Sequence, residues 1–355
     1  MDFSRPNQAR GPQERCEAVK RAGKIAVVGS GSWGTAFANA LSLKGLRVTL
    51  WARREELAAK IHETHENSDY LPGITLSPRL RATSDLKEAV RGASVVVMGV
   101  PSQGFREVLR EAAQFTEPSV PIVSLVKGLE LPTFSRMSEV IAQEIPAAWP
   151  KRVVVLSGPN LAKEIAGGYP AAAVVACADI DVADQLQELF MSPTFRTYSI
   201  SDVAGAEIGG VVKNVIAIGT GIAEGLQLGD NTKALVITRG LAEMTRLGVT
   251  FGADPMTFAG LAGVGDIICT CTSGLSRNHR VGLELGKGRM IDEILADMKQ
   301  VAEGVKASKA VHELAARAGV DLPICEAVYR VLHEGESVND MTSDLLRTVR
   351  VRERD

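Results

Sequence analysis

The stretch Ile25-Ala-Val-Val-Gly29-Ser-Gly31-Ser-Trp33-Gly34-Thr decides the fold, because it places a G-x-G-x-x-G pattern between an apolar strand and an Ala-rich helix. In such a turn the first glycine permits a tight bend, the second lets the backbone approach a pyrophosphate, and the third lets the helix pack closely on the strand. The diphosphate then lies at the helix N-terminus, where free backbone N–H groups point at it. The stretch therefore predicts a dinucleotide site built on Gly29, Gly31 and Gly34.

The residues after the second predicted strand, Val48 to Trp51, bear on which dinucleotide binds. An acidic residue about 20 positions past the glycines normally accepts the ribose 2′-hydroxyl of NAD. Arg53 and Arg54 stand there instead and favour the 2′-phosphate of NADP. Alternatively, the two arginines only solvate a loop beside Glu55 and Glu56, and use of both NADPH and NADH stays open.

Length and charge narrow the class of protein. A chain of 355 residues is too long for one ordinary core and predicts two domains. A net charge of −2 offers no broad basic field, so we expect no nucleic-acid partner. No uninterrupted apolar run reaches the roughly 18 residues that cross a bilayer, and the start of the chain has no apolar signal core. We therefore expect a cytoplasmic protein with no membrane span.

The cysteines indicate neither a disulfide framework nor a metal centre. They form an odd set without paired C-x-x-C spacing or ligand-type histidines nearby, namely Cys16, Cys177, Cys269, Cys271 and Cys325. We expect reduced thiols and no zinc.

Short apolar segments alternate with helical patterns in the first part of the chain. The expected strands are Ile25 to Val28, Val48 to Trp51, Val95 to Val100, Ile122 to Val126, Val153 to Leu156 and Ala171 to Ala176. This alternation is typical of an α/β fold with a doubly wound, mainly parallel sheet that binds its cofactor at the carboxyl edge. After about Asp202 only helices are predicted: Val203 to Leu226, Asn231 to Leu247, Asp254 to Ala262, Ser308 to Ala318 and Pro323 to His333.

The pattern divides the chain into three parts. Residues 1–23 are Pro, Gly, Arg and Glu rich and are expected to form a mobile N-terminal extension. Residues 24–202 are expected to form a dinucleotide-binding domain of the Rossmann type. Residues 203–355 are expected to form an all-α substrate-binding domain. The active cleft should lie between the two domains.

Three strand ends carry polar residues toward that cleft. Ser102 and Lys127 follow the third and fourth strands, at the edge where the nicotinamide end of a dinucleotide lies. Lys127 is a candidate substrate ligand, or else an ordinary exposed loop lysine. The turn at Gly158 and Pro159 leads into a helix whose free amides can bind an anion, although a plain helix start is the alternative.

The helical part supplies the acid and base candidates. Lys213 lies inside an apolar, Gly-rich helix where an unpaired cation would be costly, so it is a candidate proton donor to a carbonyl oxygen. The alternative is a structural lysine whose amine extends to solvent. Asp266 and Thr270 stand at i and i+4 on one helical face, although Asp266 could equally be a helix cap.

The cluster Ser276-Arg277-Asn278 offers hydroxyl, guanidinium and amide donors in consecutive positions. Such a set suits a phosphate through charge-assisted contacts to the arginine. A polar loop without a ligand is the alternative.

In their order, these motifs resemble the bacterial type of NAD(P)-dependent sn-glycerol-3-phosphate dehydrogenase. The likeness runs from Lys24 to about Leu346. It rests on Gly29-Ser-Gly-Ser-Trp-Gly-Thr-Ala, Lys127-Gly-Leu-Glu, Ser157-Gly-Pro, Lys213-Asn-Val-Ile-Ala-Ile-Gly, Asp230-Asn-Thr-Lys-Ala-Leu-Val-Ile-Thr-Arg-Gly-Leu-Ala-Glu-Met, Gly263-Val-Gly-Asp, Ser276-Arg-Asn and Val301-Ala-Glu-Gly. Each motif is modest alone, and the ordered combination is specific.

The resemblance implies reversible reduction of dihydroxyacetone phosphate to sn-glycerol 3-phosphate with NADPH, or with NADH, for glycerophospholipid synthesis. It assigns the cofactor to Ser32, Trp33, Arg53, Lys127, Ala162, Arg277, Val301 and Glu303. It assigns the substrate to Lys127, Gly158, Asn160, Lys213, Asp266, Ser276, Arg277 and Asn278. Lys213 matches the family's general acid and base, with Asp266 orienting it and Lys127 adding positive field.

One departure and two rival functions stay in view. Relatives usually hold Ser or Thr where this chain has Asn160, which weakens that contact and not the function. A hydroxy-acid or ketopantoate dehydrogenase of similar plan would need a carboxylate site, against which the cluster at Arg277 argues. A non-catalytic NADP sensor would not need Lys127, Lys213 and Asp266.

The apolar helical part and the resemblance both point to a homodimer.

Overall fold

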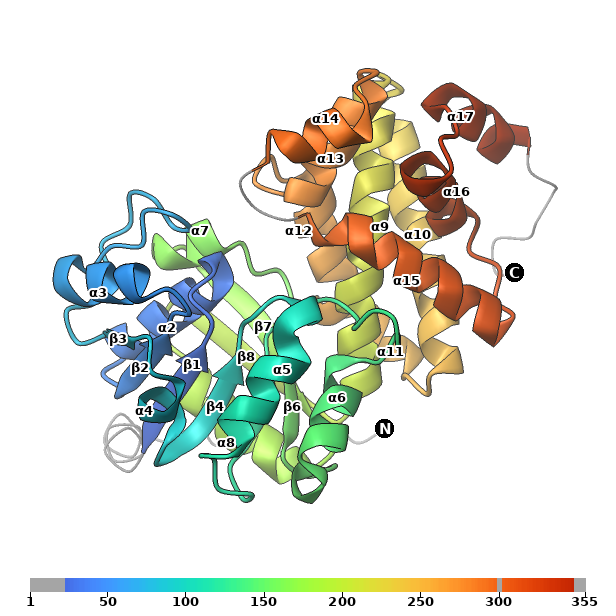
Figure 1. Cartoon of the computed structure of the whole chain (residues 1–355). Helices are drawn as coiled ribbons and strands as arrows, with labels where there is room; N and C mark the ends of the chain where they lie inside the picture. Colours follow the sequence, from blue (N-terminus) through green and yellow to red (C-terminus); the bar gives the residue numbers. More distant parts are fainter. Residues whose placement is uncertain (1–22, 299–301, 348–355) are drawn as a thin grey trace.

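The computed structural model describes residues 23–298 and 302–347. These residues form an α/β domain, followed along the chain by a domain made only of helices (Figure 1). The predicted fold class is confirmed. The last strand ends at Ile200 and the first helix of the helical domain begins at Val203. The exact domain boundaries stay a prediction, and nearly all of the predicted N-terminal extension lies outside the described residues.

The sheet has the strand order β3-β2-β1-β4-β5-β6-β7-β8. Its strands are β1 (Lys24–Val28), β2 (Val48–Trp51), β3 (Arg81–Thr83), β4 (Ala93–Met98), β5 (Ile122–Ser124), β6 (Val153–Ser157), β7 (Ala171–Cys177) and β8 (Phe195–Ile200). Every neighbouring pair is parallel apart from β6 and β7. The strand order reverses direction between β1 and β4, and dinucleotides bind outside the carboxyl ends of the strands at such a point.

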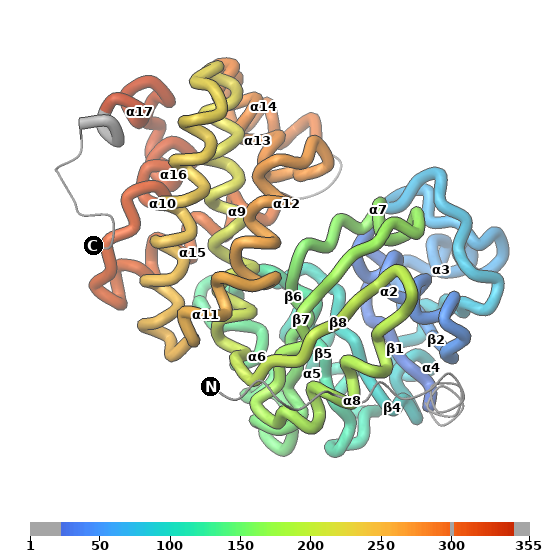
Figure 2. Tube along the Cα trace, turned by 180° about the vertical axis from the view of Figure 1, so that it is seen from behind, coloured from blue at the N-terminus to red at the C-terminus, as the bar shows by residue number. Residues whose placement is uncertain are grey.

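Helices cover both faces of this sheet (Figures 1 and 2). They are α2 (Ser32–Leu43), α3 (Glu55–Thr64), α4 (Leu86–Val90), α5 (Ser102–Ala113), α6 (Met137–Glu144), the short helix η1 (Pro146–Ala148), α7 (Ala162–Ala166) and α8 (Ile180–Phe190). Along β1, Ile25 and Val27 pack in one apolar core with Phe37 of α2, whereas Val28 packs in the opposite core with Phe105 of α5. Burial on both faces explains why the strands read as continuous apolar runs.

The six predicted strands are confirmed, and two further strands were not predicted. β3 is only three residues long, and β8 is an edge strand in which exposed Arg196 and Tyr198 alternate with buried residues. Two strands also end earlier than expected. β4 stops at Met98 and β5 at Ser124, because the chain leaves the sheet there to form the loops of its carboxyl edge.

The helical domain is built around α9 (Val203–Gly225), which is buried along nearly its whole length. The other helices are α10 (Gly229–Thr250), α11 (Pro255–Phe258), the π-helix η2 (Leu261–Gly265), α12 (Asp266–Thr272), α13 (Arg277–Gly286), α14 (Ile291–Ala296), α15 (Glu303–Ala318), α16 (Pro323–His333) and α17 (Val338–Arg347). The predicted single helix Asp254 to Ala262 is wrong. It is instead the short α11 followed by the π-turn, which brings the chain into α12.

Among the described residues, two segments are long and apolar enough to span a membrane by length and composition alone. One is α9, whose most apolar window is entirely buried among other helices, so its apolar character serves the core of the domain. The other, Pro255–Thr272, is 39% buried over its most apolar window. It is divided between α11, the π-turn and α12, and it carries the buried Asp266.

Candidate active site

The glycine-rich turn has the geometry that each of its three glycines was predicted to supply. Gly29 has φ +122°, a conformation that side chains with a Cβ rarely adopt. A Cβ on Gly34 would lie 2.1 Å from the carbonyl oxygen of Gly29, so only glycine lets α2 pack here. A Cβ on Gly31 would meet open space. A pyrophosphate therefore fits above Gly31, at the N-terminus of α2.

Ser32 and Trp33 open that helix, and their side chains are used by the protein itself. The Ser32 hydroxyl donates to the Tyr70 carbonyl at 2.7 Å. The indole of Trp33 packs on Phe37 and Phe195, with ring centroids 5.5 and 6.2 Å away. Both residues can therefore offer a cofactor their backbone N–H groups at the helix start.

Arg53 and Arg54 have different surroundings. Arg54 forms an ion pair with Asp69, with both side chains about half exposed. Arg53 is exposed, and within the described part of the chain it has no hydrogen bond or ion pair. The prediction that both arginines face a 2′-phosphate therefore needs refinement, because only Arg53 has its full charge available.

An ion cluster joins the two domains. The Lys127 ammonium, on the loop after β5, donates to Asp266 Oδ2 of α12 and to the Gly158 carbonyl, each at 2.7 Å. The Lys213 ammonium, from α9, donates to Asp266 Oδ1 at 2.6 Å and to Thr270 Oγ1 at 2.7 Å. One carboxylate thus holds two lysines from different domains.

The cluster is buried and decides two of the open alternatives. Lys213 is 6% exposed and Asp266 is 1% exposed. The alternative that Lys213 extends its amine to solvent is therefore wrong. The alternative that Asp266 only caps a helix is also wrong, since both oxygens of its carboxylate accept from lysines. Two ammonium groups and one carboxylate leave a net positive charge, which suits an anionic ligand.

Burial lowers the pKa of Lys127 to about 8. The nearby Asp266 opposes this change and Lys213 adds to it by repulsion. At neutral pH the amine is still mostly protonated, yet it is close to losing its proton. The exposed-loop alternative for Lys127 is wrong, because its side chain is largely buried in the cluster.

A chain of amides ties the helices behind the cluster. Asn214, next to Lys213, donates to the Lys127 carbonyl at 3.3 Å and accepts from Asn278 at 2.8 Å. Asn278 Oδ1 in turn accepts from the Gly304 N–H at 2.9 Å. The predicted ligand Asn278 therefore fixes α13 against α9 and α15, and one N–H of its amide is left for a substrate.

The predicted phosphate cluster is the start of a helix and not a loop. Ser276 is the N-cap of α13, where its hydroxyl accepts from the His279 N–H at 3.3 Å. Arg277 follows as the first helical residue and is exposed. Glu303 begins α15 near Arg277. Burial raises the pKa of the Glu303 carboxyl, and the positive charge of Arg277 acts against this rise. Val301 lies outside the described residues.

The turn after β6 contributes Gly158 and Asn160. Gly158 has φ +140° and presents its carbonyl to Lys127. The Asn160 amide donates to the Ala172 carbonyl at 3.2 Å, while its buried Oδ1 has no partner among the described residues. Ala162 opens α7 and packs against the core on the α2 side of the sheet. The Asn160 amide, which was expected to donate to a substrate, therefore already makes one hydrogen bond within the protein.

Two residues of the site were not assigned a role from the sequence. Thr270 was noted only for its spacing from Asp266, and it accepts from Lys213. Asn214 was quoted in a motif without a function. A polar residue beside Lys213 inside the same apolar helix was the available signal, since a buried amide needs partners.

Comparison with known proteins gives a consistent result. Residues 24–183 match the model of the N-terminal domain of NAD-dependent glycerol-3-phosphate dehydrogenase, and residues 202–343 match that of its C-terminal domain. A glycerol-3-phosphate dehydrogenase [NAD(P)+] of Streptomyces griseus is 56% identical over 316 residues, which cover 88% of this chain and 93% of the relative. The crystal structure of a glycerol-3-phosphate dehydrogenase from Coxiella burnetii is 37% identical with a TM-score of 0.87, covering 92% of this chain and 99% of that one.

The fold alone is shared more widely. A ketopantoate reductase from Ralstonia eutropha superposes with a TM-score of 0.57 at 16% identity, covering 90% of this chain and 99% of that one. Likeness at that level concerns the arrangement of the domains and does not extend to the substrate.

Proposed function

Since the chain belongs to the NAD-dependent glycerol-3-phosphate dehydrogenase family, we propose that the cluster of Lys127, Asp266 and Lys213 performs the family's chemistry in this protein. The protein is an oxidoreductase that reversibly reduces dihydroxyacetone phosphate to sn-glycerol 3-phosphate with NAD(P)H. The product supplies the backbone for glycerophospholipid synthesis. The observation that carries the residue assignment is the single buried carboxylate shared by two lysines.

Lys213 is the general acid of the reduction. An ammonium has three donors, and two of those on Lys213 are engaged by Asp266 and Thr270. The third is free to protonate the oxygen on C2 of the ketone. The nicotinamide, when bound, supplies the hydride to that carbon. Asp266 orients the lysine, because its short contact fixes the ammonium on one side.

Lys127 acts as the fixed positive charge of the cleft. Its donors to Asp266 and Gly158 leave one N–H for a substrate oxygen. A cation held in a buried site stabilises the alkoxide that develops on C2 more than it would in water. The same charge attracts the phosphorylated substrate.

The phosphate is bound at the N-terminus of α13. Arg277 supplies a guanidinium that can donate two parallel hydrogen bonds, and the free amides of the helix start add partial positive charge. Ser276 can donate its hydroxyl proton while it accepts from the helix backbone. Asn278 adds the remaining N–H of its amide.

The cofactor is held across the carboxyl edge of the sheet. The glycine turn, Ser32 and Trp33 would bind the pyrophosphate. Lys127, Ala162, Arg277 and Glu303 would also contact the cofactor, as would Val301, which lies outside the described residues. Arg53 would contact a 2′-phosphate, with Arg54 shared between that group and Asp69. The enzyme uses NAD(P)H, and we propose that it prefers NADPH.

We also propose that the enzyme is a cytoplasmic homodimer with domains at 24–202 and 203–355. Its substrate and cofactor are charged molecules that do not cross an apolar bilayer, which supports an enzyme in the same compartment as both of them.

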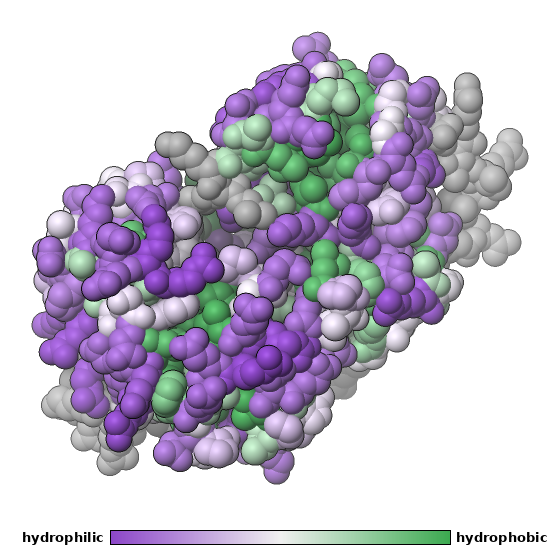
Figure 3. All heavy atoms as spheres, in the orientation of Figure 1, coloured by the Kyte–Doolittle hydropathy of each residue, from purple (hydrophilic) through white to green (hydrophobic). Residues whose placement is uncertain are grey.

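The dimer is supported by apolar residues on the surface of the helical domain. On α10, Leu235, Ala242 and Val249 recur every seven residues, and Leu235 and Val249 are about half exposed. Hydrophobic residues also gather on the face of the helical domain seen in Figure 3. Sedimentation of the wild type and of Leu235→Glu would test the dimer.

The reaction is tested by the loss of NADPH absorbance on addition of a substrate. We expect NADPH to be oxidised rapidly with dihydroxyacetone phosphate, slowly with unphosphorylated dihydroxyacetone, and not at all with ketopantoate. Comparable rates with dihydroxyacetone and its phosphate would contradict the phosphate site. Activity retained in Lys213→Met would contradict the role of the cluster.

A further inference from the structure

The loop that carries Lys127 crosses from one domain to the other. We call residues 127–138 the Lys127 strap; it connects β5 to the start of α6. The strap belongs to the α/β domain by its position in the sequence. Its residue Leu129 is nevertheless part of the apolar core of the helical domain, and Leu131 and Phe134 pack against that core. The guanidinium of Arg317 lies 4.7 Å from the centre of the Phe134 ring.

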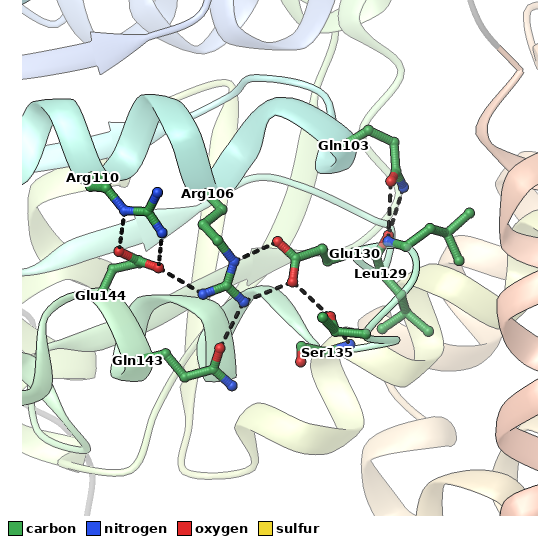
Figure 4. A network of polar contacts seen from close by, with 10 residues as sticks. Gln103, Arg106, Arg110, Leu129, Glu130, Ser135, Gln143 and Glu144 are labelled. Carbon is green, nitrogen blue, oxygen red and sulfur yellow. Dashed lines mark hydrogen bonds and ion pairs between the residues drawn. The ribbon is translucent and has the colours of Figure 1, made fainter.

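On the side of the α/β domain, α5 holds the strap through polar contacts (Figure 4). Arg106 binds both carboxylate oxygens of Glu130, each at 2.7 Å. Gln103 holds the backbone on either side of that residue: it donates to the Leu129 carbonyl at 3.0 Å and accepts from the Leu131 N–H at 3.1 Å. Two side chains of one helix thus clamp three consecutive strap residues.

Glu130 is also the centre of the strap's own turn. Its carbonyl accepts from the Phe134 N–H at 2.7 Å, and its N–H donates to the Ser135 carbonyl at 3.0 Å. The Thr133 hydroxyl donates to the carboxylate at 2.6 Å. A displacement of the Glu130 carboxylate would therefore move the whole turn, which begins three residues after Lys127.

The same arginine takes part in a second set of contacts that does not involve the strap. Arg106 and Arg110 both donate to Glu144 of α6, at 2.7 to 2.9 Å, and Arg106 also donates to Gln143 at 2.7 Å. These contacts join α5 to α6 within one domain. Arg106 thus binds two carboxylates, and of these two Glu130 is the one that belongs to the strap leading to the site.

We infer that Arg106 is a positioning residue: by clamping Glu130 it holds the Lys127 strap so that the Lys127 ammonium reaches Asp266 and the substrate across the domain interface. The inference rests on the proposed role of Lys127. A bidentate, largely buried arginine–carboxylate pair has a fixed geometry, unlike a surface ion pair. Gly128 adds a second point of contact, since a Cβ there would lie 2.9 Å from Ser102 Oγ at the start of α5.

The inference predicts that losing the strap contact impairs use of the substrate more than binding of the cofactor. In Glu130→Gln, the new amide places a second N–H donor opposite an N–H of Arg106, so the clamp opens. We expect kcat/KM for dihydroxyacetone phosphate to fall at least about tenfold, mainly through KM, while the Kd for NADPH changes by a smaller factor.

Glu144→Gln is the matched control, because it makes the same chemical change on the other partner of Arg106. We expect it to lower Tm by an amount similar to Glu130→Gln and to leave kcat/KM within about twofold. Gln103→Ala removes the backbone clamp from an exposed position without stranding a charge, and it should repeat the KM effect in part. Equal kinetic losses in Glu130→Gln and Glu144→Gln would overturn the inference, since both would then act through stability.

A double variant separates this inference from the proposed function. In a Lys127→Met background, Glu130→Gln should cause no further loss of kcat/KM, because its effect acts through the lysine. Additive losses would overturn the positioning role. Full activity of Lys127→Met alone would instead contradict the role proposed for Lys127 itself.

Discussion

The glycine turn and the ion cluster reach their geometry by opposite routes. The turn is complete within Gly29 to Gly34, and backbone conformation and the absence of side chains define it. The cluster joins Asp266 to Lys213, 53 residues away, and to Lys127, 139 residues away, and charged side chains define it. The glycine turn is thus a local structure, whereas the ion cluster exists only once both domains are packed. Changes in the two regions should therefore affect different measurable quantities.

The largest expected effect separates chemistry from cofactor binding. Lys213→Met removes the proton donor but leaves the buried Asp266 with Lys127 as its partner. We expect kcat to fall by about a hundredfold or more, the usual contribution of a general acid, while the Kd for NADPH is nearly unchanged. Steady-state kinetics and NADPH fluorescence titration check this. A folded variant with more than about a tenth of wild-type kcat would show that another group donates the proton.

Two alanine substitutions in the turn should divide packing from ligand contact. In Gly34→Ala the new Cβ would lie 2.1 Å from a backbone oxygen, so we expect destabilisation of about 1–3 kcal/mol or more. In Gly31→Ala the Cβ meets open space, so thermal unfolding should be unchanged while the affinity for NADPH falls. Equal loss of Tm in both variants would mean that Gly31 is also a packing position.

Arg277 extends the comparison to the phosphate. Arg277→Leu should raise KM for dihydroxyacetone phosphate by about ten- to hundredfold, since charge-assisted hydrogen bonds contribute roughly 1.5–3 kcal/mol. The ratio of kcat/KM for dihydroxyacetone phosphate to kcat/KM for unphosphorylated dihydroxyacetone should fall accordingly. Arg280→Leu, an exposed arginine on the same helix, is the control and should leave KM unchanged. A preserved preference in Arg277→Leu would exclude it as the phosphate ligand.

Arg53 and Asp69 test the far end of the cofactor site. Arg53→Asp should lower kcat/KM for NADPH by at least about tenfold and leave NADH activity unchanged or improved, because the new carboxylate repels a 2′-phosphate and accepts from a 2′-hydroxyl. Asp69→Asn should act in the opposite direction, since it frees Arg54 from its ion pair. Equal losses with both cofactors in Arg53→Asp would mean that the arginine supports the fold or the shared adenosine.

The smallest expected effect is a pH dependence that belongs to the cluster alone. Burial lowers the pKa of Lys127 to about 8, so its ammonium is present below that pH and lost above it. We expect kcat/KM for dihydroxyacetone phosphate to fall as pH rises through about 8. In Lys127→Arg, the side chain keeps its charge at high pH, so this fall should disappear even if activity is lower. An identical pH profile in that variant would assign the titration to another group.

The local parts of this molecule could be predicted from the sequence. A glycine pattern between an apolar run and an Ala-rich helix has few backbone solutions, so the turn and β1 followed directly. The long apolar α9 was predicted to within a residue, because its helix signals are contiguous. Short or exposed elements were harder: β3 has only three residues, and the π-turn at Leu261–Gly265 follows from packing and not from periodicity.

By itself, the sequence determined the class of each domain, the residue types available for hydride-transfer chemistry, and the glycines that a pyrophosphate requires. Only the tertiary structure decided that the Asp266 carboxylate holds two lysines, that Arg54 is paired with Asp69, and that Glu130 is clamped by Arg106. The physical reason is the distance along the chain between the residues that interact. Backbone conformation depends on neighbours along the chain, whereas the partner of a charge is whichever side chain the completed fold brings within a few ångströms of it.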